Sequence, residues 1–185
     1  MTFILEKHAP SSGITEWNMS KKTDYSAEEW KAISGAPVAA GLLITLSDPS
    51  GPIGVAKEGL ALGRAIAESA SGDAPEIVKA VAESVKTGGG RPEMPAMPLG
   101  DRTQMKNALV DAIKTAVAAV AAKSQGEVEA YKTWLMSVAS KVSQAAKEGG
   151  FLGIGGTVVS ADEQAALRQL ADVIGMNARA TPGGA

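Results

Sequence analysis

Five acidic residues, four of them at expected turns or helix ends and one on the second expected helix, carry the carboxylates best suited to chemistry. They are Asp48, Glu58, Glu148, Asp162 and Glu163. A hard divalent cation takes several oxygen ligands, which have to converge from different segments of a chain. These carboxylates meet if two helical hairpins pack with their turns together. The sequence therefore predicts an acidic site for a divalent cation.

The same residues also have a purely structural interpretation. Asp162 and Glu163 follow Ser160 at an expected helix start, where the positive end of the helix dipole stabilises acidic side chains. Asp48 opens a segment dense in proline, serine and glycine, which is typical of a turn. Ion binding and simple structural roles both stay open on the sequence alone.

Other catalytic chemistries find no support in the residues. The chain has no cysteine, which excludes thiolate nucleophiles, disulfides and cysteine-bound metals. Its one histidine, His8, lies in a polar stretch near the N-terminus and provides no ordinary imidazole relay. The glycine-rich loop 149–156 lacks the lysine and the Ser/Thr of a P-loop, and no Gly-x-Ser-x-Gly elbow occurs. We therefore expect a protein that is not an enzyme.

Composition and charge indicate one globular domain. The chain has 185 residues, of which 45% are hydrophobic, enough to build a core. Its 18 basic and 20 acidic residues give no electrostatic reason to expect nucleic acid as a partner. The N-terminus lacks the basic leader and apolar core of a secretory signal. The apolar run 36–46, at about 11 residues, is too short to cross a bilayer. We expect a cytoplasmic protein without a transmembrane segment.

Helix caps and apolar periodicity predict an all-α bundle of about six helices, and no segment reads as a β-strand. Prolines recur at every third residue near the middle of the chain, which excludes regular helix there and indicates a linker. The predicted division is an irregular arm at 1–24, a single helical domain at 25–176 with halves 25–87 and 101–176, a Pro/Gly-rich linker at 88–100 and a flexible tail at 177–185.

Capping signals mark several of these helices. Ser26 and Glu29 have the spacing of a capping box before an apolar run, and so do Ser124 and Glu127. Asp101 is expected to cap the first helix of the second half. These residues predict where the helices begin.

Proline and glycine predict two irregularities in the first half. Pro37 lies inside the first helix, where it removes an amide donor, so the helix is expected to kink or restart near Ser34 and Gly35. Gly59 and Gly63 are four residues apart in the second helix, a spacing that indicates close approach by another helix.

Charged residues also follow a helical pattern. Lys57, Arg64 and Glu68 share one face of the second helix, while Leu62, Ile66 and nearby alanines and glycines lie on another.

The two halves of the chain have a similar order of elements. Trp30 begins a helix that leads through a Gly/Pro-rich turn into a second helix, and Tyr131 begins one that leads through a Gly-rich loop into another. The likeness is architectural and does not extend residue by residue. Two related helical hairpins, or the chance similarity of any antiparallel helices, both account for it.

Residues 147–176 resemble the TerB-like, tellurite-resistance family of small helical proteins. In that family an acidic Asp-Gly loop precedes an Ile/Val-Ser-x-x-Glu helix start, and acidic residues are implicated in metal binding. By this match Ser160 and Glu163 correspond to the family's serine and glutamate, whereas Lys147-Glu148-Gly149-Gly150 stands where the loop aspartate would be. The matching residues are Gly156-Thr157-Val158-Val159-Ser160-Ala161-Asp162-Glu163, Ala166-Leu167, Leu170-Ala171 and Ile174-Gly175-Met176.

The resemblance implies a non-enzymatic binding or scaffold protein of a stress response, with a divalent cation as its expected cofactor. A protein is the expected partner, and association with a second copy of the chain stays open. The alternative hypothesis is carriage of a small apolar ligand or lipid, because helices rich in alanine and glycine leave room for a cavity between them.

Overall fold

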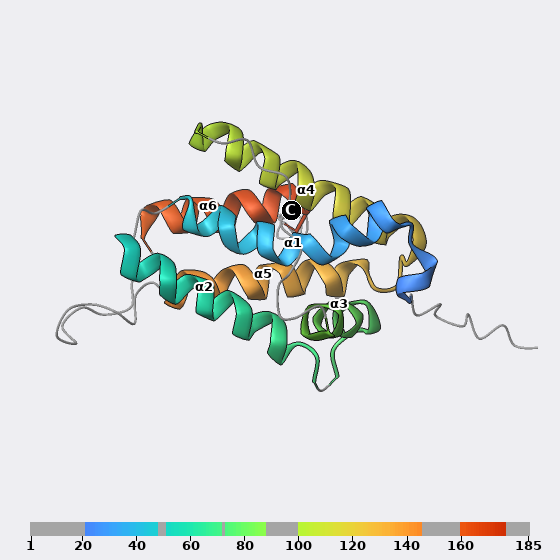
Figure 1. The fold of residues 1–185 in the computed structure, drawn as a ribbon. Coiled ribbons are helices and arrows are strands. Elements are labelled where there is room, and N and C mark those ends of the chain that lie inside the picture. Colours follow the sequence, from blue (N-terminus) through green and yellow to red (C-terminus); the bar gives the residue numbers. More distant parts are fainter. Residues whose placement is uncertain (1–20, 48–50, 72, 88–99, 146–159, 177–185) are drawn as a thin grey trace, which may run out of the picture.

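The computed structural model describes residues 21–47, 51–71, 73–87, 100–145 and 160–176. These residues form an all-α bundle without a β-strand (Figure 1). None of its helices is long and apolar enough to cross a membrane. The elements are the 3-10 turn η1 (Lys22–Asp24) and the helices α1 (Ala27–Thr45), α2 (Gly51–Glu68), α3 (Glu76–Thr87), α4 (Arg102–Lys123), α5 (Val128–Ala145) and α6 (Ala161–Val173).

Helix α1 is the centre of the bundle. Of its 19 residues 12 are buried, as expected of a helix that is apolar on all sides. It contacts each of the other five α-helices and packs most extensively on α4 and α5. Helix α5 runs in the same direction as α1, and α2, α4 and α6 run in the opposite direction (Figure 1). The apolar run 36–46 is therefore core, as the sequence predicts.

The restart of the first helix that was expected near Ser34 and Gly35 is wrong, because α1 is continuous from Ala27 to Thr45. A kink there stays a prediction. A proline has no amide to donate to the carbonyl four residues earlier, which here belongs to Ile33. The hydroxyl of Tyr131 donates to that carbonyl at 2.7 Å, and the Tyr131 side chain is fully buried. A donor from α5 thus replaces the missing bond of α1.

The glycines that approach another helix are also not those that the spacing indicated. Around Gly59 and Gly63 an added Cβ would meet nothing within 4 Å, and both residues are exposed. At Gly41 of α1 an added Cβ would lie 2.8 Å from Cδ1 of Leu62 on α2. The close approach of α1 and α2 is therefore made at Gly41, because the other two glycines lie on the outer face of α2.

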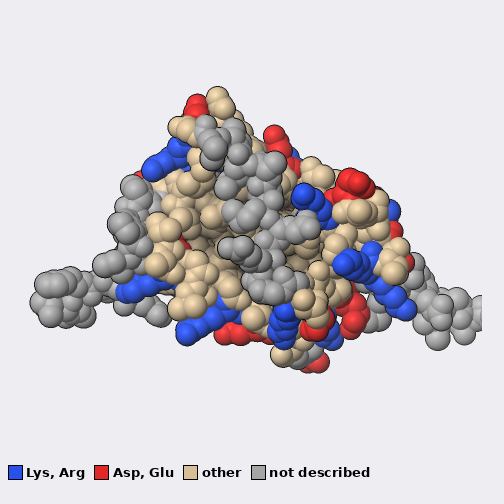
Figure 2. Space-filling view, viewed as in Figure 1, with Lys and Arg blue, Asp and Glu red and all other residues tan. Residues whose placement is uncertain are grey.

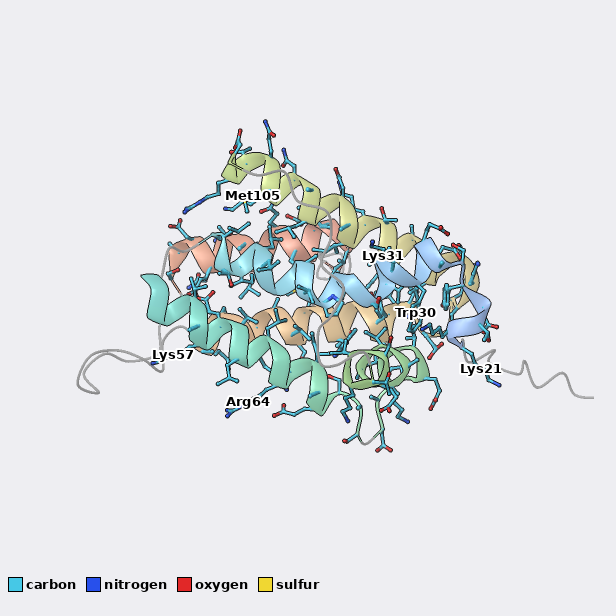
Figure 3. All side chains as sticks on the ribbon, in the orientation of Figure 1. Lys21, Trp30, Lys31, Lys57, Arg64 and Met105 are labelled. Atoms are coloured by element: carbon cyan, nitrogen blue, oxygen red, sulfur yellow. The ribbon has the colours of Figure 1, made fainter. Side chains whose placement is uncertain are left out.

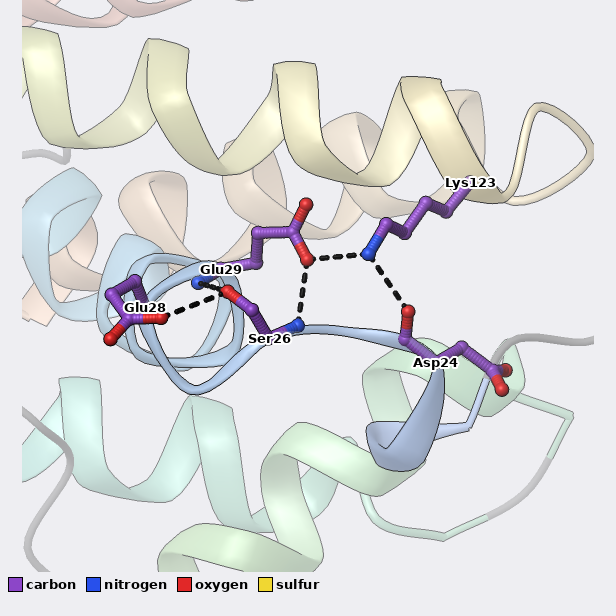
Figure 4. A network of polar contacts seen from close by, with 5 residues as sticks. All are labelled: Asp24, Ser26, Glu28, Glu29 and Lys123. Carbon is purple, nitrogen blue, oxygen red and sulfur yellow. Dashed lines mark hydrogen bonds and ion pairs between the residues drawn. The ribbon is translucent and has the colours of Figure 1, made fainter.

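The start of α1 is tied to the end of α4 (Figure 4). Ser26 and Glu29 form the predicted capping box, with the Glu29 amide 3.2 Å from Ser26 Oγ and the Ser26 amide 2.7 Å from Glu29 Oε2. Lys123 Nζ lies 2.6 Å from Glu29 Oε2 and donates to the Asp24 carbonyl at 2.9 Å. The hydrogen bond from Lys123, followed by that from the Ser26 amide, lowers the pKa of Glu29 below its ordinary value.

The short α3 is held by a carboxylate from the turn between α4 and α5. Glu127 Oε1 accepts from the amide of Ile77 in the first turn of α3 at 3.0 Å, and Glu127 Oε2 accepts from the hydroxyl of Ser124 at 2.8 Å. Because the first amides of a helix have no partner inside it, this carboxylate caps α3 from 50 residues away. The expected capping box at Ser124 and Glu127 does not lie at a helix start, because Ser124 ends α4 and α5 begins at Val128; instead the two side chains bond to each other.

Several predicted segments lie wholly or mostly outside the described residues. Residues 1–20 of the arm, 88–99 of the linker and 177–185 of the tail are among them. Each of the two predicted hairpins, α1–α2 and α5–α6, has its helices in contact. A duplication that relates the hairpins stays a prediction.

Candidate functional site

The carboxylates predicted to bind a cation are only partly within the described residues. Asp48 and Glu148 lie outside them. Glu58 is buried on α2, with 2% of its surface exposed, and Asp162 is exposed in the first turn of α6. In the part of the chain that the structure describes, no group of three or more acidic or histidine side chains is placed to hold a metal ion. The predicted ion site therefore stays a prediction.

Glu163 has a clear structural role. Its Oε2 accepts from the Ser160 amide at 2.9 Å, while Ser160 Oγ accepts from the Glu163 amide at 3.1 Å. This is the capping box that the sequence predicts at the start of α6, and Glu163 is 2% exposed. At the other end of the helix Gly175 has φ +72°, a left-handed conformation that favours glycine and ends the helix. The local fold of residues 160–176 is thus as expected from the sequence.

A groove between α2 and α5 has an exposed leucine among its lining residues. It has a volume of about 510 Å³ and is open to solvent. Small apolar residues, Leu60 and charged side chains all contribute to its lining. The lining residues are Lys57, Leu60, Ala61, Arg64, Ala65 and Glu68 from α2, and Lys141, Gln144 and Ala145 from α5. We call this surface the α2–α5 groove.

Leu60 is exceptional in its exposure. With 59% of its surface exposed, it is one of two large hydrophobic side chains that are exposed in the described part of the chain, and the other is Val55 of the same helix at 48%. Exposed apolar groups that cluster on one surface often mark a place where another molecule binds. Leu60 lines the groove, so the exposure and the concave shape coincide.

The charges of the groove are mainly positive. Lys57, Arg64 and Lys141 line it with a single carboxylate, that of Glu68. Lys141 Nζ lies 2.8 Å from Glu68 Oε2. The hydrogen bond from Lys141, its charge and then that of Arg64 lower the pKa of Glu68 below its ordinary value, so this carboxylate is ionised and paired near neutral pH. Lys57 and Arg64 project from the same side of α2 (Figure 3). In the same orientation, basic side chains lie along the lower left edge of the molecule (Figure 2).

A second pocket, also of about 510 Å³ and open to solvent, lies between α3 and the segment before α1. It contains both charge types, with Lys79 and Glu76 paired at 3.2 Å. Both pockets are open to solvent, and Ala65 is the one residue of the buried core among those that line them. The alternative hypothesis of an apolar ligand carried in the bundle centre therefore gains no support from them.

The sequence indicated the charged residues that α2 contributes to the groove, but not those that α5 contributes. The helical spacing of Lys57, Arg64 and Glu68 placed them on one face, and the structure confirms this. Leu60 lies between them on that face. A large apolar residue within a charged face is a sequence feature from which a binding surface could have been predicted. The contribution of Lys141 depends on how α5 packs against α2, which no local pattern reveals.

Comparisons with known proteins identify no relative: no family model matches the chain, and neither a curated protein nor a solved structure is similar to it. The likeness of residues 147–176 to the TerB-like family thus rests on the sequence motif alone.

Proposed function

We propose that the chain is a non-enzymatic binding or scaffold protein, of the kind that its TerB-like motif implies, and that it binds a protein partner through the α2–α5 groove. The observation that carries this proposal is the 59% exposure of Leu60 in an open groove. Burial of a leucine side chain by a partner contributes about 1.5–3 kcal/mol. Leu60 is thus the anchor of the proposed interface.

The rest of the groove suits an anchor of this type. Ala61, Ala65 and Ala145 beside Leu60 are small, which lets a partner come close to the backbones of α2 and α5. The groove is lined by both apolar and charged residues, and interfaces commonly combine an apolar centre with a polar rim. The groove favours a macromolecular partner over a small molecule, because it is open to solvent and small-molecule sites enclose most of their ligand.

Affinity capture with matched baits tests the proposal. The full chain would be used as bait in cells that express it natively, together with Leu60→Asp and with Ala118→Asp, which changes an exposed residue of α4. We expect a protein retained by the wild-type chain and by Ala118→Asp to be reduced about tenfold or more with Leu60→Asp, because a charge in place of Leu60 costs at least as much as the lost contact. Circular dichroism would establish that both variants are folded. Equal capture by all three baits would contradict the proposal.

A divalent-ion site is a second and separate proposal. It rests on the five carboxylates that the sequence singles out, of which Glu58 and Glu163 are buried. A bound cation raises the melting temperature of the folded state by mass action. We expect Mg²⁺ or Ca²⁺ to raise the melting temperature of the wild-type chain and of Asp111→Asn, a change at an exposed residue of α4, but not of Glu58→Gln. Equal melting temperatures with chelator and with either cation would exclude the ion site.

A further inference from the structure

We infer that the occupant of the α2–α5 groove is an acidic amphipathic helix of another protein, with its apolar side on Leu60 and its carboxylates facing Lys57 and Arg64. This inference rests on the proposed function and names the chemistry of the partner. Three observations carry it: the sign of the groove's charges, the geometry of the two helices that form it, and the identity of the residues that line it.

The charges of the groove select an acidic partner. Lys141 is engaged with Glu68 at 2.8 Å, so Lys57 and Arg64 remain as the positive charges on the α2 side of the groove. The two residues are seven positions apart on one helix, which places them on the same face two turns from each other. Carboxylates spaced by about two turns on a partner helix would face both of them.

The shape of the groove fits a helix. Helices α2 and α5 are antiparallel neighbours, and from Lys57 to Glu68 the groove follows α2 for about 16 Å at the α-helical rise, or three turns. An amphipathic helix laid between two helices is a recurrent recognition mode, with apolar anchors at every third or fourth residue. Ala61 and Ala65, which line the groove with Leu60, have small side chains that leave space for such anchors.

A second copy of the chain fits this surface less well. Two grooves placed face to face would bring Lys57 and Arg64 of each copy close to the same residues of the other. Like charges at a desolvated interface oppose association. The charge pattern therefore favours a different, acidic protein over self-association through the groove.

A pair of fluorescent peptides tests the inference directly. Each is about 21 residues long, with three heptads of leucine on one face, and they differ only in having glutamate or lysine at the flanking positions. Fluorescence anisotropy with nanomolar peptide and the full chain measures their affinities. We expect the glutamate peptide to bind about tenfold or more tightly than the lysine peptide, and its affinity to fall as NaCl rises from about 50 mM to about 500 mM.

Variants locate the binding. The double change Lys57→Gln and Arg64→Gln is expected to remove most of the preference for the glutamate peptide, whereas Lys114→Gln, at an exposed residue of α4, leaves it unchanged. Equal binding of the two peptides, tighter binding of the lysine peptide, or no binding of the glutamate peptide would overturn the inference. If the inference fails but captured partners still depend on Leu60, the groove binds a partner of another chemistry. If the peptide binds but captured partners do not depend on Leu60, the proposed function fails instead.

Discussion

The hydroxyl of Tyr131 donates at 2.7 Å to the carbonyl of Ile33, the helical acceptor that Pro37 leaves without an amide. The two residues are 98 positions apart and belong to α5 and α1, which pack along the middle of the bundle. A proline in a central buried helix is thus accommodated because a neighbouring helix supplies the donor. The contact explains why α1 continues through Pro37.

A double-mutant cycle measures this relationship. Tyr131→Phe removes the donor and is expected to lower the free energy of unfolding by about 1–3 kcal/mol, because the Ile33 carbonyl is buried. In the Pro37→Ala background residue 37 has an amide for that carbonyl, so the same change is expected to cost about 1 kcal/mol less. Urea unfolding at neutral pH measures the free energy of unfolding of the wild-type chain, the two single variants and the double variant. Equal costs in the two backgrounds would show that the tyrosine does not compensate for the proline.

Tyr131 also predicts a dependence of stability on alkaline pH. Burial, followed by the influence of Tyr25, raises the pKa of Tyr131 in the folded chain far above its ordinary value. In the unfolded chain a tyrosine ionises near pH 10, at about its model value. The unfolded state therefore loses this proton first, and the free energy of unfolding is expected to fall as pH rises above about 10.

Urea unfolding between about pH 8 and pH 11 checks this expectation. Tyr131→Phe is the control, since it cannot ionise and is expected to show a shallower decline. A decline of the same steepness in both proteins would assign the effect to other groups.

The glycines of α1 and α2 are expected to respond in opposite ways to alanine. Gly41→Ala places a methyl group 2.8 Å from Leu62 Cδ1 and is expected to destabilise the protein by about 1–3 kcal/mol. Gly59→Ala and Gly63→Ala meet open space and are expected to stabilise α2 by about 0.5–1 kcal/mol each. Thermal unfolding distinguishes the two groups, and a stabilising Gly41→Ala would show that Leu62 moves aside without cost.

The buried carboxylate of Glu127 is expected to govern the order of α3. Glu127→Ala removes the bond to the Ile77 amide and that to Ser124, and a loss of about 1.5–3 kcal/mol is expected, as for hydrogen bonds to charged groups. Hydrogen exchange should be faster at Ile77 and its neighbours. Glu129→Ala, a change at a partly exposed pair with Lys132, is the control, with an expected effect below about 1 kcal/mol. Unchanged exchange in α3 would contradict the capping role.

The features of the fold that were predicted correctly from the sequence are those formed between residues a few positions apart in the chain. Capping boxes at Ser26 and Ser160 were found because donor and acceptor lie three positions apart. The cap that Glu127 provides to α3 was not found, since it joins residues 50 positions apart. The wrong expectation at Gly59 has the same cause, because spacing shows which residues share a face but not which face meets another helix.

In the candidate site, too, the residues on one helix could be predicted from the sequence, and the contact with a second helix could not. Helical spacing placed Lys57, Arg64 and Glu68 together, and the structure adds Lys141 through the packing of α5 on α2. Asp48 and Glu148, two of the residues predicted to bind a cation, lie outside the described residues. The melting temperatures with and without a divalent cation therefore decide whether the chain binds an ion.

Photo-crosslinking at position 60 tests the central claim most directly. The full chain, with a benzophenone amino acid in place of Leu60, would be irradiated in cells that express it natively, beside a second protein with the same probe in place of the exposed Ala118. We predict that the probe at 60 crosslinks a discrete protein partner, that the probe at 118 does not, and that the crosslink disappears in the Lys57→Gln and Arg64→Gln background. Crosslinks from position 118 but none from position 60 would contradict the assignment of the α2–α5 groove as the binding surface.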